Sequence, residues 1–595
     1  MTSATNLDLP DGDRADRSAI SDAIYPLMFS GASRSGAVAH FNDPSTSKLV
    51  EFFHGKGLAA LKQEDQREEW YEDWLAYQAE HRIYASVLSP AGFSSLGNHF
   101  DLLRYARFLE VFGYFSPAHG YSAQVTFLGL WAILMGDNVA LKQEAVAALE
   151  RGGLLAFAVS ERGHGSDLLG NEFVLTATAP GTFIANGSKY YIGNANVAAI
   201  IPVLARQEDQ TGGGRTRRSP AVLFALRPAQ SKGFANVQKI RTLGVRAAFV
   251  GSFDVKDHQA TETDVIAEGR RAWDAVLGAV TLGKYFLGFG SIGICEHALG
   301  EALEHLNSRI LYGKPATAMA HIRARIAQAY ARLTAMKLYA YRALDYIQAA
   351  RDDDRRYQLF CAVQKAKVST EGVKVMSLLS ECVGAKGFEA DRYFEMALRD
   401  VQLFPGLEGS AHINLSLTAQ FAPRYFAEPN HKLVEPPSLI AGGTARQENP
   451  YLMTARTGGV QRITFPDCLR AYEPLAAIPN VGRFMRQIKS FQRFLESQSK
   501  STEADLHVSI CVGQCVATIA YAQLIAENCT HASIPAEAVS AIFHLLVIDL
   551  SSSALELASL AELDQMSQRL ARRIVTVPRS SGADWDHITA RMDGK

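Results

Sequence analysis

The spacing of hydrophobic residues divides the chain into blocks of different structure. From about residue 20 to 150, apolar residues recur every three or four positions, as in FDLLRYARFLEVFGYF, which predicts amphipathic helices. From about 152 to 258, short runs rich in β-branched and aromatic residues alternate with Gly, Asn, Pro and Asp, which predicts an antiparallel β domain. Long helical runs return between about 265 and 425.

A stretch rich in Pro and Gly, AEPNHKLVEPPSLIAGGTARQENP, separates these blocks from a last helical one. The predicted fold class is therefore α+β. The predicted divisions are a poorly ordered leader (1–20), an N-terminal α domain (21–150), a middle β domain (151–260), a C-terminal four-helix bundle (261–426), a linker (427–459) and an extra helical domain (460–595).

One glycine motif invites a different interpretation. GFGSIG, residues 288–293, matches the G-x-G-x-x-G pattern of dinucleotide-binding loops. A true fingerprint follows a strand, opens a helix and has an acidic residue about twenty positions later. Here the sequence is helical on both sides, and the region twenty residues on, SRILYGK, has no acid. We predict that these glycines permit close helix packing and bind no nicotinamide cofactor.

Composition excludes several other functions. The 60 basic and 61 acidic residues nearly cancel, so no overall field attracts nucleic acid. The N-terminus lacks a signal-peptide pattern, and no run of about 18 uninterrupted apolar residues occurs, so we expect a cytoplasmic protein. The seven cysteines include no C-x-x-C pair, and the histidines occur in no H-E-x-x-H motif. We therefore predict that the protein has no disulfide framework and no metal site.

Three short segments offer candidate chemistry. In SERGHGSD, residues 160–167, two glycines free the backbone to form an anion-binding nest, although an ordinary strand-to-loop turn is the commoner structure for such a pattern. In FPGLEGSAHIN, Glu408 lies at a corner where burial would raise its pKa and make it a general base; a solvated helix-cap carboxylate is the alternative. Arg309 in NSRILYGKP suits either a phosphate or a surface ion pair.

In chain order, six segments resemble motifs of the acyl-CoA dehydrogenase and acyl-CoA oxidase superfamily. The resemblance extends over roughly residues 25–425. The segments are FAVSERGHGSDLLGNE, NGSKYYIGNA, TLGVRAAFVGSFDV, SRILYGKP, VGAKGFEADRYFEMALRD and FPGLEGSAHIN.

The resemblance implies a non-covalently bound FAD and an acyl thioester held against its ring. Glu408 would remove the α-proton of the acyl group while a hydride leaves the β-carbon for flavin N5, giving a trans-2-enoyl thioester. The implied cofactor-binding residues are Val159, Ser160, Gly165, Ser166, Tyr191, Gly193, Arg309, Tyr312, Gly384, Gly387 and Ser410. The implied substrate-binding residues are Ser166, Lys284, Leu407 and Gly409. Arg309 and Tyr312 would reach the FAD of a neighbouring subunit, which implies a homodimer.

The chain also departs from the family pattern. Gly193 stands where a threonine usually bonds the flavin, and Lys284 where an arginine often lies near the base. Gly-His-Gly in SERGHGSD is frequent in oxidases, so the electron acceptor could be molecular oxygen in place of an electron-transferring flavoprotein. A carrier-protein thioester could replace acyl-CoA, and a catalytically silent scaffold on the same fold is the non-enzyme alternative.

Overall fold

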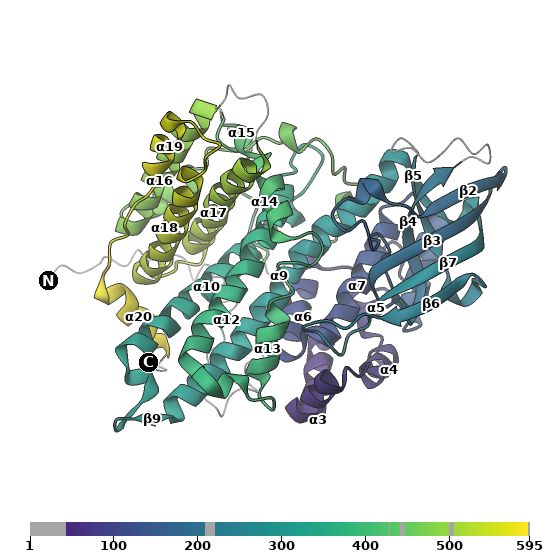
Figure 1. Ribbon diagram of the computed structural model, residues 1–595, viewed down its shortest axis with the longest axis horizontal. Helices are drawn as coiled ribbons and strands as arrows, with labels where there is room; N and C mark the ends of the chain where they lie inside the picture. Colours follow the sequence, from purple (N-terminus) through teal and green to yellow (C-terminus); the bar gives the residue numbers. More distant parts are fainter. Residues whose placement is uncertain (1–42, 209–219, 428, 441–446, 499–504, 593–595) are drawn as a thin grey trace.

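The computed structural model describes residues 43–208, 220–427, 429–440, 447–498 and 505–592. The predicted leader lies outside these residues. The described chain combines a helical region, a sheet and a second helical region, which confirms the α+β class (Figure 1). In the view of Figure 1 the sheet lies to the right, and the C-terminal helices lie on the opposite side of the molecule.

Six helices form the part of the N-terminal region that the structure describes. Its centre is α7, which is buried along almost its whole length, as expected for a helix that is apolar on every face. Side-chain caps fix the starts of its neighbours, since Asp101 accepts from the Arg104 N–H and Asn138 from the Leu141 N–H. The helices are α3 (Pro44–Arg67), α4 (Glu72–Glu80), α5 (Ile83–Leu88), α6 (Leu102–Phe115), α7 (Pro117–Leu134) and α8 (Val139–Glu150).

The sheet follows with strand order β6-β7-β3-β2-β4-β5-β8, and β1 pairs with β4. The strands are β1 (Leu154–Leu155), β2 (Val174–Ala179), β3 (Thr182–Gly193), β4 (Ala198–Glu208), β5 (Ala221–Leu226), β6 (Phe234–Lys239), β7 (Val250–Thr261) and β8 (Val265–Glu268). Most pairings are antiparallel as predicted, but β2–β4 and β1–β4 are parallel. After the β2–β3 hairpin, β4 returns to the free edge of β2 and must therefore run in the same direction as β2. The sheet continues to Glu268, past the boundary predicted at residue 260.

A 40-residue helix, α9, runs from the sheet through the second helical region. The elements of this region are α9 (Gly269–Ser308), the hairpin β9 (Ile310–Leu311) and β10 (Lys314–Pro315), α10 (Ala320–Gln348), α11 (Tyr357–Val363), the π-helical turn η6 (Gln364–Val368), α12 (Ser369–Val383), α13 (Tyr393–Val401), α14 (Ala411–Ala419) and α15 (Ala422–Tyr425). The 3₁₀ turns are η2 (Leu168–Gly170), η3 (Pro228–Gln230), η4 (Glu262–Asp264), η5 (Ala316–Ala318), η7 (Gly384–Phe388), η8 (Pro450–Met453), η9 (Val460–Arg462) and η10 (Arg470–Leu475).

The last helices pack directly on this region. They are α16 (Pro479–Gln498), α17 (Leu506–His531), α18 (Ala536–Ala558), α19 (Gln565–Arg572) and α20 (Gly582–Met592). At Gly513 of α17 a Cβ would lie 2.1 Å from the carbonyl oxygen of Leu415, so only glycine lets α17 approach α14 this closely. The predicted linker is anchored as well, because Asn449 donates to the carbonyl oxygens of Gln348 and Ala350 at the end of α10.

GFGSIG lies within α9, as predicted, and its glycines face α6 and its neighbours. A Cβ on Gly293 would lie 2.0 Å from the carbonyl oxygen of Glu110, and a Cβ on Gly113 would lie 2.2 Å from that of Gly290. These contacts are with backbone, which cannot rotate away. The motif is therefore a helix-crossing point; the absence of nicotinamide binding stays a prediction.

Gly293→Ala is expected to lower the free energy of unfolding by about 3 kcal/mol, because the added methyl group must push α6 and α9 apart. Gly300→Ala is the matched control on the same helix, where a Cβ meets nothing within 4 Å. That change should be neutral or slightly stabilising, since alanine favours helix by up to about 1 kcal/mol. Urea unfolding measures both; equal stability of the two variants would contradict a tight α6–α9 crossing.

Among the described helices, three are long and apolar enough to cross a membrane, judged by length and composition alone: α9, α17 and α18. Within the folded chain, 78%, 72% and 61% of their apolar windows are buried against other parts of the protein. Buried packing therefore accounts for most of this apolar surface. The cytoplasmic location stays a prediction.

Candidate active site

Glu408 lies in the corner between α13 and α14. Its backbone has a φ of 50°, and Gly409 follows with a φ of 87°. A left-handed conformation is uncommon for a residue with a side chain, and such strain persists only where neighbours hold it. Here the Ala411 N–H donates to the carbonyl oxygen of Pro405, and Asn414 donates to those of Gly409 and Ser410. The corner thereby directs the Glu408 carboxylate toward α7 and α9.

The two carboxylate oxygens of Glu408 have different surroundings. Oε1 accepts a hydrogen bond from Gln124 Nε2 at 3.0 Å, and the same amide also donates to the carbonyl oxygen of Gly283. Tyr105 donates to Gln124 Oε1, which fixes the orientation of the amide. Oε2 is buried and has no hydrogen-bond partner among the described residues. A Cβ on Gly283 would lie 2.5 Å from Oε2, so the lack of a side chain there leaves room for this oxygen.

Two buried lysines lie near this carboxylate. Lys365 belongs to η6 and donates to the carbonyl oxygen of Phe404, while Lys284 comes from α9. Within the described chain, neither has a carboxylate at salt-bridge distance. A π-helical turn shifts the residues that follow it around the helix, and such turns are frequent at functional sites.

Burial and charge set the pKa values of this group. Burial raises the pKa of Glu408 to about 7, although the hydrogen bond from Gln124 and the charges of Lys365 and Lys284 oppose the rise. Burial lowers the pKa of Lys365 to about 7 and that of Lys284 to about 8, against the attraction of Glu408. Glu408 therefore titrates near neutral pH, as the burial hypothesis from the sequence required; the solvated-cap alternative does not describe it.

Residues 160–167 form a closed loop after β1. Glu161 and His164 exchange backbone hydrogen bonds, and the Ser160 hydroxyl donates to the carbonyl oxygen of Tyr190. Glu161 is buried, pairs with Lys189 Nζ at 2.9 Å and accepts from the backbone N–H groups of Glu172 and Phe173. These contacts hold the inner side of the loop against the sheet.

The outer side of the same loop is open. Gly165 and Ser166 are exposed, and their backbone N–H groups have no partner within the described residues. A Cβ on Gly163 or Gly165 would meet nothing within 4 Å. Free N–H groups on a glycine-containing loop suit the oxygens of an anionic group, so these residues fit the phosphates of FAD.

Other implied contacts fall into two places. Val159 is buried beside the loop, and Tyr191 is 60% exposed with a φ of 63°. Leu407, Gly409 and Ser410 flank the base in the corner described above. At Gly193 a Cβ would lie 2.6 Å from Val125 Cγ2. Close packing on α7 therefore explains why this chain has glycine where the family usually has threonine.

Four implied contacts lie far from Glu408 of the same chain. Arg309 and Tyr312 are at the other end of α9, about 37 Å from Lys284 along the helix axis, and the Tyr312 side chain is 96% exposed. Gly384 and Gly387 are in η7, and the whole of α12, about 22 Å along its axis, separates η7 from Lys365 in η6. The structure therefore does not bring these four residues to the site of their own chain.

Two residues of the site were not predicted from the sequence. Gln124 is an isolated amide in an apolar helix, and Lys365 lies in the run CAVQKAKVST, in which the structure buries every residue except Thr370. A polar residue inside a continuous apolar helical run was the available signal, because such a residue needs a buried partner.

The structure supplies two parts that a flavin-dependent oxidoreductase needs, a buried carboxylate with one free oxygen and an open glycine-containing loop suited to phosphate. Residues 156–258 match the family model described as acyl-CoA dehydrogenase, middle domain, and residues 271–422 the one described as acyl-CoA dehydrogenase, C-terminal domain. The chain belongs to the acyl-CoA dehydrogenase superfamily of FAD-dependent enzymes.

Relatives and solved structures agree with this family. The chain is 24% identical to cyclohex-1-ene-1-carbonyl-CoA dehydrogenase of Syntrophus aciditrophicus (strain SB), over 56% of this chain and 78% of the relative. It resembles the structure of an acyl-CoA dehydrogenase complexed with FAD from Bacillus anthracis, with a TM-score of 0.69, 15% identity and coverage of 97% of each chain. Butyryl-CoA dehydrogenase from Megasphaera elsdenii gives a TM-score of 0.57 and 19% identity, over 71% of this chain and 100% of that one.

Proposed function

We propose that this enzyme oxidises the α,β-bond of an acyl-CoA to the trans-2-enoyl thioester, with Glu408 as the base. The observation that carries the proposal is the buried, unpartnered Oε2 of Glu408. An oxygen held in this way is ready to accept a proton without first losing a hydrogen bond. Gly165 and Ser166 would hold FAD, which would supply the hydride acceptor.

The residues around Glu408 suit removal of a weakly acidic α-proton. A base with a pKa of about 7 is largely ionised at slightly alkaline pH and still binds a proton well. Gln124 holds Oε1, so the proton is directed to Oε2. The backbone N–H of Glu408 has no partner within the described residues, and it is available to stabilise negative charge on the thioester oxygen.

The electron acceptor and the carrier of the acyl group belong to the same proposal. We favour an electron-transferring flavoprotein and CoA. The His164 ring, the feature that suggested oxygen, lies 3.7 Å from Asp167 and against Gly170, within the packing of its own loop. It therefore gives no support to oxygen as acceptor.

The direct test is anaerobic mixing of the FAD-loaded protein with a panel of straight-chain, branched and cyclic acyl-CoAs. Loss of the flavin's visible absorption, with formation of the enoyl-CoA, is the expected result. Hydrogen peroxide released in step with the product would select an oxidase, and reduction only by carrier-protein thioesters would select the biosynthetic alternative. A colourless protein that takes up no FAD would support the alternative of a catalytically silent scaffold on the same fold.

Subunit sharing is part of the proposal as well. Arg309 and Tyr312 lie too far from Glu408 to serve their own chain's site, and Tyr312 is almost fully exposed. We propose a homodimer in which each hairpin β9–β10 contacts the FAD of the other subunit. Arg309→Ala should then lower the FAD content while leaving Glu408 and its neighbours unchanged.

The pH dependence follows from the Glu408 pKa. Below about pH 7 the carboxyl is protonated and cannot act as a base, so kcat/KM should rise with pH through about 7. Gln124→Leu removes a hydrogen bond that stabilises the carboxylate, which raises the pKa of Glu408. Because hydrogen bonds to charged groups contribute about 1.5–3 kcal/mol, the rising limb should move up by about one pH unit or more.

Gln143→Leu is the control for this measurement, since Gln143 is an exposed residue of α8. The pH profile of kcat/KM should be unchanged in this variant. If Gln124→Leu also keeps the limb of the unmodified enzyme, Gln124 does not set the pKa of the base.

A further inference from the structure

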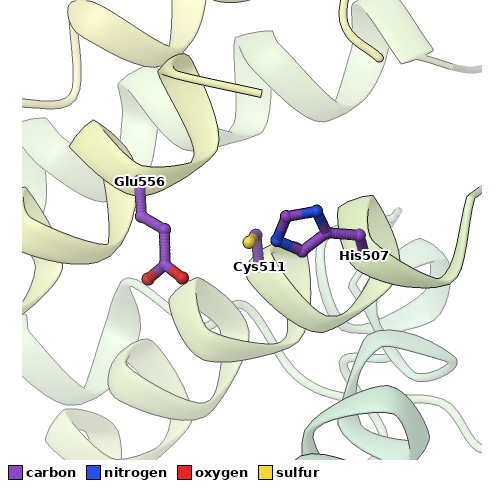
Figure 2. A group of neighbouring side chains, drawn as sticks. All are labelled: His507, Cys511 and Glu556. Atoms are coloured by element: carbon purple, nitrogen blue, oxygen red, sulfur yellow. The ribbon is translucent and has the colours of Figure 1, made fainter. Parts of the chain in front are cut away.

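Three side chains of kinds that commonly bind metals lie close together in the C-terminal helices, away from the Glu408 site. His507 and Cys511 lie one turn apart at the start of α17, and Glu556 lies in the last turn of α18. A nitrogen of His507, the sulfur of Cys511 and an oxygen of Glu556 are all within 4.8 Å of one another. Figure 2 shows the three side chains around one space between the two helices.

A fourth donor is close by. Glu562, which follows α18, has its Oε1 3.9 Å from His507 Nδ1. In the described chain, neither Glu556 nor Glu562 forms an ion pair with a lysine or arginine. The group therefore combines two carboxylates, a thiol and an imidazole with no fixed positive charge paired to the acids.

The arrangement of burial suits a cation. Cys511 is buried, while the carboxylates of Glu556 and Glu562 beside it are exposed. A divalent ion placed among these side chains would be attracted by both carboxylates and would bind the sulfur as thiolate. His507 and Glu556 are exposed and can rotate, which lets the donors close to the roughly 3.3–3.8 Å spacing of a tetrahedral zinc site.

We propose that His507, Cys511 and Glu556 bind a zinc-type divalent ion, with Glu562 or water as the fourth ligand. The mixture of sulfur, nitrogen and oxygen donors favours Zn²⁺ over Mg²⁺ or Ca²⁺, which prefer oxygen ligands. The ion would join the start of α17 to the end of α18. It would be structural, because all three ligands belong to the last helices and none of them contacts the Glu408 site.

Little in the sequence points to this site. The only local signal is the spacing H-x-x-x-C, which places a histidine and a cysteine on one helix face. The third ligand comes from the next helix, and its approach depends on how α17 and α18 pack. The prediction of no metal site rested on the lack of a compact motif.

The test uses the full-length, FAD-loaded protein, stripped with a chelator and titrated with Zn²⁺ by calorimetry. We expect one Zn²⁺ per chain, release of the thiol proton detected by repeating the titration in buffers of different ionisation enthalpy, and a higher midpoint of thermal unfolding. His507→Ala, Glu556→Gln and Cys511→Ser should each weaken binding at least 100-fold. Cys515→Ala, which removes a buried thiol one turn further along α17, should bind Zn²⁺ like the unmodified chain.

Two results would overturn the proposal: no binding by the unmodified protein, or equal binding by all four variants, which would indicate surface adsorption only. Should Cys511→Ser fail to fold, the two exposed-residue variants still decide. Flavin reduction by acyl-CoA is measured separately and does not enter this test, so failure of one proposal leaves the other standing.

Discussion

Glu408→Gln is expected to lower the rate of flavin reduction by acyl-CoA at least about 10³-fold and to leave a folded, yellow protein. General-base catalysis typically contributes 10²–10⁴-fold, and among the described residues Gln124 donates to no other carboxylate that could replace the lost one. The amide has nearly the same shape as the carboxyl, so the corner between α13 and α14 should keep its conformation. Rapid mixing under anaerobic conditions measures the step directly.

The control for this variant is Glu537→Gln, an exposed glutamate in the first turn of α18. Its flavin should be reduced at the rate of the unmodified enzyme. The FAD content and the unfolding midpoint of all three proteins should agree. If the flavin of Glu408→Gln is reduced at the normal rate, Glu408 is not the base. The free Oε2 of Glu408 would then not support the proposed function.

Lys189→Met is expected to lower the free energy of unfolding by about 3–5 kcal/mol and to reduce the FAD content. Lys189 is almost fully buried in β3 and pairs with Glu161 at the start of the loop 160–167. Removing the lysine leaves the charge of Glu161 buried and without its cation, which is the costly way to break a buried ion pair. The same loop carries Gly165 and Ser166, so FAD retention should fall with stability.

Two further variants separate the ion pair from general effects. Lys256→Met changes an exposed lysine of β7 and should alter neither stability nor FAD content. The double change Glu161→Met with Lys189→Met removes both charges and should recover part of the lost stability. Urea unfolding and the ratio of flavin to protein absorption measure both effects. A double variant no more stable than Lys189→Met would show that the charge left on Glu161 is not the cause.

The order of helices, sheet and helices could be predicted because each block has its own hydrophobic period. The direction of individual strands could not. β4 has the same apolar character whether it runs parallel or antiparallel to β2, and its direction depends on which edge of β2 is free after the hairpin. The end of the sheet was misplaced for a related reason: β8 is only four residues long and leads directly into α9.

Glu408 was predicted because its motif is local and resembles that of a known family. Gln124 was not, because its role depends on a contact with Glu408 across 284 positions of sequence. Lys365 is less predictable still, since a π-helical turn changes which face of the helix a residue occupies. Arg309 and Tyr312 show the opposite limit: their motif is local, but the FAD that they are expected to reach belongs to another chain.

The close crossing of α14 and α17 connects the C-terminal helices to the corner that holds Glu408. α14 begins three residues after Glu408, and the glycine at position 513 fixes how near its backbone lies to α17. The direction in which α14 leaves the corner is thus set from outside by a segment added late in the chain. A small change in the packing of that segment would change the direction of the Glu408 carboxylate without changing any residue that contacts the substrate. The direction of the Glu408 carboxylate therefore depends on packing behind the corner as well as on the residues beside it.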